Sequence, residues 1–373
     1  MRYYFGAYLF PAFIVKLFPF ITSKAAFCGY LFLGYLLLSK LILERHRNYF
    51  YAIIALFIAL AWSGADVYAE HLLRALKGLP STPLLGIHSE RWAYDNLGLS
   101  IEYSSILTAL IWVPHQSIPV YIFILLILQR HQLPLSFLAA TFSLLAIWTP
   151  YGMIGALPIF TWLLWSRRLE LQSTFNLIAL ATFITTSVVV AIYLSSDMPT
   201  GGICISCIPH RLLRPSNFFF FLLIELGLFF LVLRRKIYKD PLCLISIAML
   251  MALPFLYGNT SDFVMRASLG PIFLLVIKST DALLEAPSVK RKLALAILIV
   301  ILCVPTSANE LNYFLGSGSS HRELPPFDPL SERASAQFAY GANYSASEFL
   351  EICGWKFLPQ YFTQEKPKLL RSP

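Results

Sequence analysis

Charged residues are scarce in this sequence: they make up 13% of the 373 positions, whereas 57% of the residues are hydrophobic. With a mean hydropathy of +0.67, the chain carries more apolar surface than one water-soluble core can bury. The scarcity of charge therefore excludes an ordinary soluble protein. It indicates an integral membrane protein, and apolar runs of about 16–20 residues favour helices over a barrel, whose strands would alternate over about ten residues.

Several familiar motifs are also missing. The sequence contains no P-loop, no dinucleotide-binding glycine fingerprint, no HExxH and no nucleophile elbow, which disfavours soluble nucleotide chemistry. Cys204 and Cys207 form a CxxC without a second cysteine pair, so no zinc site is predicted and no cofactor is indicated. The order of segments that makes a cleavable signal peptide is absent, and the first apolar segment is expected to stay in the membrane.

Basic residues outnumber acidic ones, which gives a formal net charge of +9. These residues fall in short clusters between apolar runs, which is typical of cytoplasmic anchoring and not of a nucleic-acid-binding surface. We therefore predict a membrane protein with no nucleic-acid partner. The clusters lie at 40–47, 130, 167–168, 234–239 and 290–292.

The apolar runs alternate so that every basic cluster falls on one side. The predicted segments are 3–22, 25–43, 49–64, a short interfacial helix at 101–113, 118–130, 133–149, 153–166, 174–194, 218–233, 241–257, 269–284 and 293–306. This pattern predicts an all-α transmembrane bundle of about ten membrane segments in the inner membrane. It comprises a membrane domain over 1–306, with outer-face loops at 65–117, 195–217 and 258–268, and a small external tail over 307–373.

Most of the informative polar residues lie between Trp62 and Pro119. Asp66 follows a break in an apolar helix, where a carboxylate can act as a general base, bind a metal or merely solvate the helix end. Glu90 and Trp92 can hold a sugar by hydrogen bonding and ring stacking. The alternative is an ion pair of Glu90 with Arg91 beside an interfacial tryptophan.

Further candidates interrupt apolar sequence. His115 and Gln116 follow Trp112-Val113-Pro114, where a buried imidazole requires a hydrogen bond and can serve a site or only stabilise the break. Tyr103 can help to position a sugar. Glu225 lies inside an apolar span, where an acid either relays protons or forms a hydrogen bond between helices.

Two other predicted outer loops carry arginines. Arg266 stands four positions after Asp262, so the two side chains can pair on one helix face, or Arg266 can hold a phosphate through its planar fork. Arg214 is a second candidate for an anionic lipid head group. The predicted catalytic residues are thus Asp66, Glu90 and His115, and the predicted substrate-binding residues are Trp92, Tyr103, Gln116, Arg214, Asp262 and Arg266.

Five short motifs together carry a family resemblance. They are Trp-Ser-Gly-Ala-Asp at 62–66, His-Ser-Glu-Arg-Trp at 88–92, Glu-Tyr-Ser-Ser-Ile-Leu-Thr at 102–108, Trp-Val-Pro-His-Gln at 112–116 and Asp-Phe-Val-Met-Arg-Ala-Ser at 262–268. Over about residues 1–285 the chain resembles uncharacterised polytopic bacterial membrane proteins whose layout is similar to that of GT-C-type glycosyltransferases. The resemblance implies a transferase that uses a polyprenyl-phosphate-linked sugar and a glycan acceptor at the outer face of the inner membrane.

One departure from that layout affects the catalytic acid. GT-C enzymes place it in an external loop after a first span, whereas residues 3–12 of this chain resemble sequence found just after such a loop. The expectation is that the first span and its acid are missing, and the role of Asp66 as base is inferred from its position alone.

Other functions fit the same sequence. A polymerase of O-antigen or exopolysaccharide would also have about ten spans and arginine-bearing outer loops. A transporter or flippase of lipid-linked glycans would need paired charges near the bilayer midplane and broken helices. A non-catalytic partner subunit is a further alternative. The sequence leaves the sugar, the lipid and the acceptor open.

Overall fold

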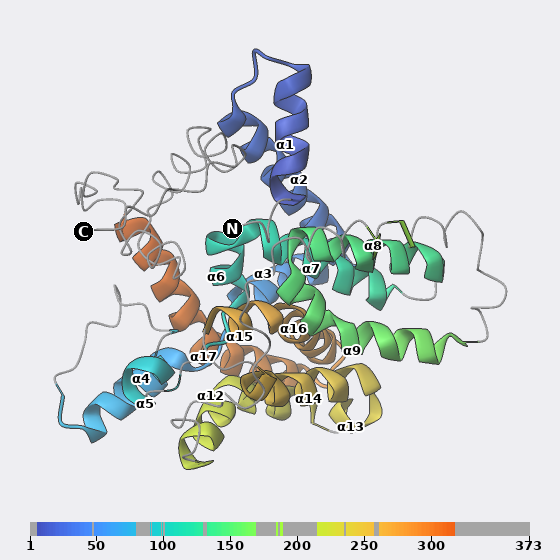
Figure 1. Cartoon of the computed structure of the whole chain (residues 1–373). Coiled ribbons are helices and arrows are strands. Elements are labelled where there is room, and N and C mark those ends of the chain that lie inside the picture. The colour runs from blue at the N-terminus through green and yellow to red at the C-terminus, as the bar shows by residue number, and fades with distance from the viewer. Residues whose placement is uncertain are drawn as a thin grey trace, which may run out of the picture.

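The computed structural model describes residues 6–46, 48–79, 90, 92–97, 99, 101–129, 133–168, 184–185, 187–188, 215–234, 236–256 and 261–317. These residues are overwhelmingly helical, which confirms the all-α prediction for the described part of the chain (Figure 1). The helices are α1 (Gly6–Leu17), α2 (Ser23–Leu43), α3 (Tyr49–Ala61), α4 (Asp66–Leu76), α5 (Trp92–Leu97), α6 (Ile106–Trp112), α7 (Pro114–Leu128), α8 (Leu135–Trp148), α9 (Pro150–Ser166), α12 (Pro215–Leu233), α13 (Lys236–Lys239), α14 (Pro241–Leu256), α15 (Ser261–Ala267), α16 (Leu269–Leu284) and α17 (Val289–Ser317).

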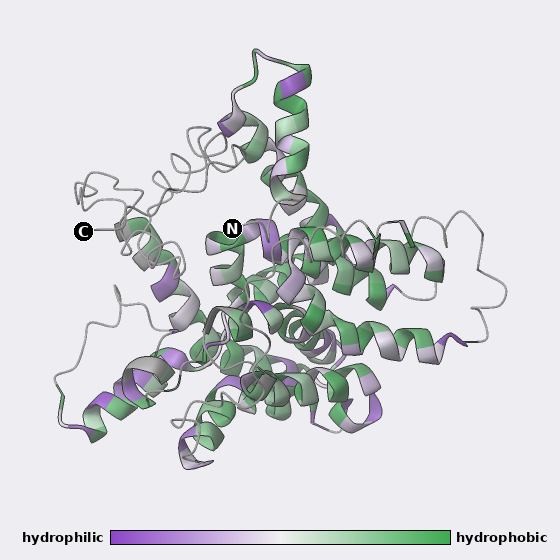
Figure 2. Cartoon of the chain, viewed as in Figure 1, coloured by the Kyte–Doolittle hydropathy of each residue, from purple (hydrophilic) through white to green (hydrophobic). Residues whose placement is uncertain are grey.

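Four helical stretches in the described residues are long and apolar enough to cross a membrane. They are Ser23–Leu43, Tyr49–Leu76, Pro215–Leu233 and Val289–Asn312. Large apolar side chains face outward along them, including those of Phe32, Phe57 and Phe219, and Figure 2 shows hydrophobic colour along most of these helices. Outward apolar surface of this kind suits lipid contact. The count of about ten segments stays a prediction.

Side-chain caps explain where several helices begin. Asn48 accepts a hydrogen bond from the Phe50 N–H at 2.9 Å, and Thr149 accepts one from Gly152 at 3.2 Å. Such caps satisfy N–H groups that the first helical turn leaves without a partner. Pro114 begins α7, where its missing N–H costs nothing. The polar sequence around His115 is therefore a helix start, with only Val113 separating α6 from α7.

The central element is α16, which is buried along most of its length. It packs against α3, α7, α9, α12 and α14. Phe273 stacks on Tyr121 of α7 with ring centroids 4.2 Å apart, and Gly270 lies beside Val120 of the same helix. The predicted span 269–284 coincides with this helix.

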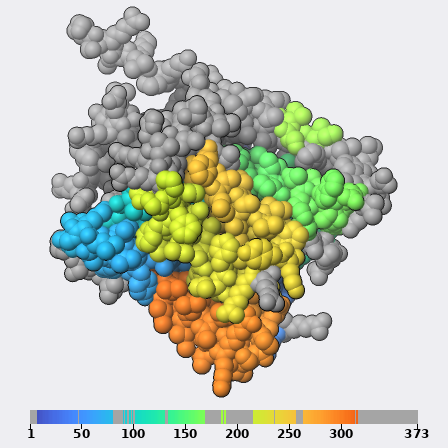
Figure 3. All heavy atoms as spheres, turned by 90° about the horizontal axis from the view of Figure 1, so that it is seen from below, coloured from blue at the N-terminus to red at the C-terminus, as the bar shows by residue number. Residues whose placement is uncertain are grey.

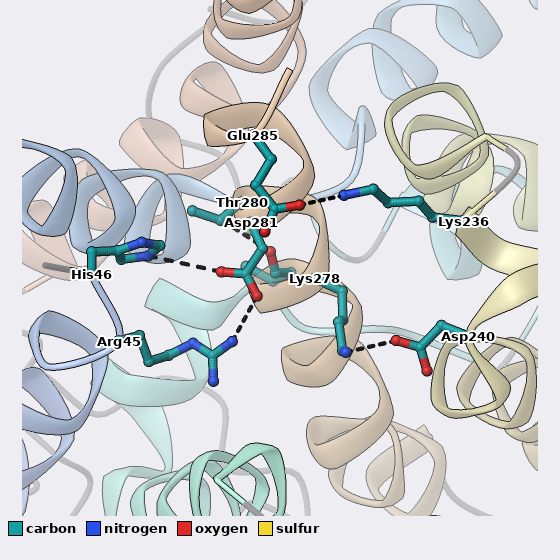
Figure 4. A network of polar contacts seen from close by, with 9 residues as sticks. Arg45, His46, Lys236, Asp240, Lys278, Thr280, Asp281 and Glu285 are labelled. Carbon is teal, nitrogen blue, oxygen red and sulfur yellow. Dashed lines mark hydrogen bonds and ion pairs between the residues drawn. The ribbon is translucent and has the colours of Figure 1, made fainter. Parts of the chain in front are cut away.

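The structure brings two of the predicted basic clusters, 40–47 and 234–239, to one face of the bundle. Asp281 of α16 accepts a hydrogen bond from Arg45, after α2, at 2.6 Å (Figure 4). Lys236 of α13 contacts Glu285 at 2.7 Å, and Lys278 contacts Asp240 at 2.6 Å. The ends of α2, α12 and α16 thus meet on the side that the positive-inside rule assigns to the cytoplasm.

Asp281 is the most heavily engaged acid on this face, because His46 also lies 3.8 Å from it. Asp281→Asn should lower the free energy of unfolding by about 1.5–3 kcal/mol, the usual contribution of a charge-assisted hydrogen bond. Thermal unfolding of the purified protein measures this loss. As a control, Lys40→Gln breaks only the exposed ion pair with Glu44 and should leave the midpoint of thermal unfolding unchanged. Equal midpoints for both variants would contradict the prediction.

The last helix is longer than the sequence suggests. The last predicted span ends at residue 306, but α17 continues to Ser317. Thr306, Ser307, Asn309 and Glu310 are buried although they are polar. Thr306 and Ser307 donate hydrogen bonds to backbone carbonyls at the break between α3 and α4, and Glu310 accepts one from the Glu90 N–H.

Candidate functional site

The apolar run of α3 and α4 is interrupted at residues 62–65, and this break organises the site. Trp62 is extended at the end of α3, and its ring stacks on Phe229 of α12 with centroids 5.0 Å apart. The freed backbone groups are satisfied by α17. Its contacts with the break are Ser63 Oγ to Cys303 O at 2.7 Å, Thr306 Oγ1 to Gly64 O at 3.2 Å and Ser307 Oγ to Ala61 O at 3.0 Å. Broken helices persist at membrane depth when neighbouring helices supply such bonds.

Two carboxyl groups from distant segments meet at this break. The Nε1–H of Trp92 donates to Asp66 Oδ1 at 3.1 Å and to Glu225 Oε1 at 3.3 Å. Asp66 is 1% exposed, Glu225 7% and Trp92 fully buried. A Cβ on Gly64 would lie 2.5 Å from Asp66 Oδ1 and 2.8 Å from Glu225 Oε2. The absence of a side chain at Gly64 therefore leaves room for both acids.

Glu90 forms a second part of the same polar region. One of its oxygens, Oε1, accepts from the Ser105 N–H at 2.9 Å and from Thr108 Oγ1 at 2.7 Å, at the start of α6. The Glu90 N–H donates to Glu310 of α17 at 3.3 Å. These contacts tie Glu90 to α6 and α17. Arg91 lies outside the described residues, so the alternative of an ion pair between Glu90 and Arg91 stays a prediction.

Aromatic rings enclose the centre on the α12 side. Phe221 stacks on Trp92 at 5.9 Å and lies 5.0 Å from the ring of Tyr103. The Tyr103 hydroxyl donates to the Leu250 carbonyl of α14. Figure 3 shows the surface of this side, where α4 lies beside α12 and α17. Four predicted site residues, Asp66, Glu90, Trp92 and Tyr103, therefore gather around one centre.

His115 and Gln116 are buried at the start of α7 and belong to a neighbouring environment. The His115 ring lies 6.4 Å from that of Tyr8 in α1, and its Nε2 is 3.0 Å from Gln116 Nε2. These contacts give His115 and Gln116 hydrogen-bonding and packing roles between α1 and α7. The structure does not show them in contact with the Asp66 centre.

The structure describes only some of the predicted phosphate-binding residues. Arg266 lies on α15, which packs against α9, α14 and α16. Burial lowers the pKa of Arg266 to about 9, so the guanidinium stays charged at pH 7. The side chain of Asp262, the whole of Arg214 and the pair Cys204 and Cys207 lie outside the described residues.

The predicted site residues did not include two acids of the centre. The hydrogen bond between helices that was considered for Glu225 is present, but its donor, Trp92, is 133 positions away in the chain. Glu310 was assigned to the external tail. The signal that would have found both is the break at Gly64, because a broken helix in a membrane requires polar partners.

The described residues contain no group of three His, Cys, Asp or Glu side chains arranged to hold a metal ion. An apolar cavity of about 290 Å³ lies between α2, α3 and α6, lined in part by Leu38, Leu56 and Leu110.

Comparison with protein-family models, with curated proteins and with solved structures finds no match for this chain.

Proposed function

We propose that this chain is a membrane glycosyltransferase of surface-polysaccharide or glycolipid assembly. It transfers a sugar from a polyprenyl phosphate at the outer face of the bacterial inner membrane, within a bundle of about ten membrane segments. The observation that carries the proposal is the enclosed carboxylate at Asp66, held by an indole N–H beside a helix break. A positioned acid of this kind suits removal of a proton from an acceptor hydroxyl.

The contacts assign different roles to the surrounding residues. Asp66 Oδ2 is buried and accepts no hydrogen bond from the described residues, so this oxygen is the base. Glu90 is anchored by Ser105 and Thr108 and holds the loop in place. Trp92 uses its N–H on the two acids, so it orients the base and does not bind the sugar through that group. Arg266, charged at pH 7, is the candidate for binding the phosphate leaving group.

The apolar cavity beside α6 supports a lipid substrate. It lies on the α2 and α3 side of α6, whereas Thr108 of the same helix reaches Glu90. A lipid tail in this cavity would place its head group within a few turns of the carboxylates. The apolar chain of a polyprenyl-phosphate donor matches this cavity, and its phosphate requires a cationic partner, for which Arg266 is the candidate.

Reconstituted protein tests this function directly. Proteoliposomes containing the chain and a radiolabelled polyprenyl-phosphate sugar should transfer label to a glycan acceptor, while protein-free liposomes should not. In cells, deletion should leave glycans that lack one sugar. Single unpolymerised repeats in the deletion strain would instead show a polymerase, and complete glycans with no transfer in vitro would overturn both functions.

A second candidate, a transporter or flippase of lipid-linked glycans, is favoured by one specific observation. Glu225 lies ten residues after the start of α12 and eight before its end, or about 15 and 12 Å along the helix. This depth is near the middle of a bilayer, and its partner Asp66 begins the helix after a break. Movement of the labelled lipid across acceptor-free proteoliposomes, without release of sugar, would establish transport in place of transfer.

A further inference from the structure

The side chains of Asp66 and Glu225 lie close enough together to share a proton. Both side chains share a single donor, the Trp92 indole N–H, at 3.1 and 3.3 Å. The two carboxyl groups also converge on Gly64, where a Cβ would lie 2.5 Å from Asp66 Oδ1 and 2.8 Å from Glu225 Oε2. Two ionised carboxylates held this close repel each other, whereas one proton held between them allows one oxygen to donate to the other.

The charged groups around Asp66 and Glu225 also favour a bound proton. The charged groups in electrostatic contact with Asp66 are Glu225, Glu90 and Glu310, and Glu102 acts on Glu225. All of these groups are acids. The uncharged titratable neighbours are Tyr103, beside Glu225, and the Cys303 thiol, beside Asp66. Like charges in a dry environment repel strongly, and a bound proton removes one of the charges.

The unused oxygen of Asp66 shows where a proton can be exchanged. Asp66 is 1% exposed, and its Oδ2 is buried without a hydrogen-bond partner among the described residues. Oδ1 already faces Trp92 and Glu225. A buried acceptor without a donor is costly unless it is protonated or receives a ligand's hydrogen.

We propose that Asp66 and Glu225 form a proton-binding site that holds one exchangeable proton between them at pH 7. In this state the pair carries one negative charge. It accepts a second proton when a hydroxyl group is deprotonated at Asp66, becomes neutral, and returns to its starting state when that proton leaves to water. The shared proton depends only on the pair itself, so this inference holds whether the centre performs transfer or transport.

Infrared difference spectroscopy of the purified protein in lipid nanodiscs tests the site without any substrate. Wild type at pH 7 should show the C=O stretch of a protonated carboxyl group, shifted to lower frequency in deuterated buffer. Asp66→Asn and Glu225→Gln should each shift this band, because the remaining buried acid no longer shares its proton, and the double variant Asp66→Asn/Glu225→Gln should abolish it. The exposed acid Glu44 provides a control, and Glu44→Gln should leave the band unchanged.

Two outcomes would overturn the proposal. The first is a wild-type spectrum at pH 7 with no protonated carboxyl group, which needs no variant and so does not depend on folding. The second is a band that survives unchanged in the double variant Asp66→Asn/Glu225→Gln. A band that behaves as expected in a protein without transferase activity would retain the proton site and reject only the transferase function.

Discussion

Asp66→Asn is expected to slow glycosyl transfer by about 10²- to 10⁴-fold, the usual contribution of a positioned general base. Asparagine keeps the size of the side chain, and its Oδ1 still accepts the Trp92 N–H bond seen for Asp66. The protein should therefore fold while losing the base. Initial rates of label transfer in proteoliposomes measure the effect.

The control for this variant is an acid on the opposite face of the bundle. Glu44 follows α2 and pairs with Lys40 at the exposed surface, so Glu44→Gln should transfer sugar at the wild-type rate. Transfer at the wild-type rate by Asp66→Asn, in protein that inserts normally, would remove Asp66 from the mechanism. The anchored acid Glu90 would then be the remaining candidate.

Gly155→Ala should have the largest effect on folding. A Cβ at Gly155 of α9 would overlap the backbone carbonyl oxygen of Ala267, at the end of α15. Backbone cannot rotate away as a side chain can, so the helices must separate. Overpacking of this kind costs about 1–3 kcal/mol or more. The yield of monodisperse protein and its thermal midpoint should both fall.

Gly227→Ala is the matched comparison, because it also places alanine in an apolar helix. The nearest atom to its Cβ would be a Leu223 methyl group at 3.6 Å, an ordinary contact. Alanine is favoured over glycine in a helix by about 0.5–1 kcal/mol, so this variant should match or exceed wild type. Equal stability of the two variants would contradict the close packing of α9 on α15.

The helices of the bundle were largely predictable because composition determines them. The span predicted at 269–284 matches α16, and that at 241–257 matches α14 to within a residue. Both are continuous apolar runs between clear polar boundaries, and such runs form helices in a membrane. The prediction at 174–194 lies almost entirely outside the described residues.

The candidate site was predictable only in part. Asp66, Glu90, Trp92 and Tyr103 were identified because their polar stretch stands out in an apolar chain. Their pairing with α12 and α17 depends on which helix faces pack together, and no local pattern records that. The polar sequence after residue 306 was therefore assigned to a tail, whereas it begins with Ser307, whose hydroxyl donates to the Ala61 carbonyl at the break.

The stretch predicted as an outer loop at 65–117 shows the same limitation. Its described residues include α4, α5 and α6, and many of their side chains are buried. Polar residues indicate solvent only when the fold offers them no partner. Here the Ser105 N–H, the Thr108 hydroxyl, the Trp92 indole and α17 supply the partners, so an acid-rich segment enters the interior of the bundle.

The most direct test is an experimental structure in lipid nanodiscs with a polyprenyl-phosphate analogue bound. We expect the phosphate to contact Arg266 and the head group to approach Asp66 Oδ2, with Glu225 and Trp92 placed as described above. A lipid bound elsewhere, with Asp66 and Arg266 facing separate surfaces, would contradict the transferase account.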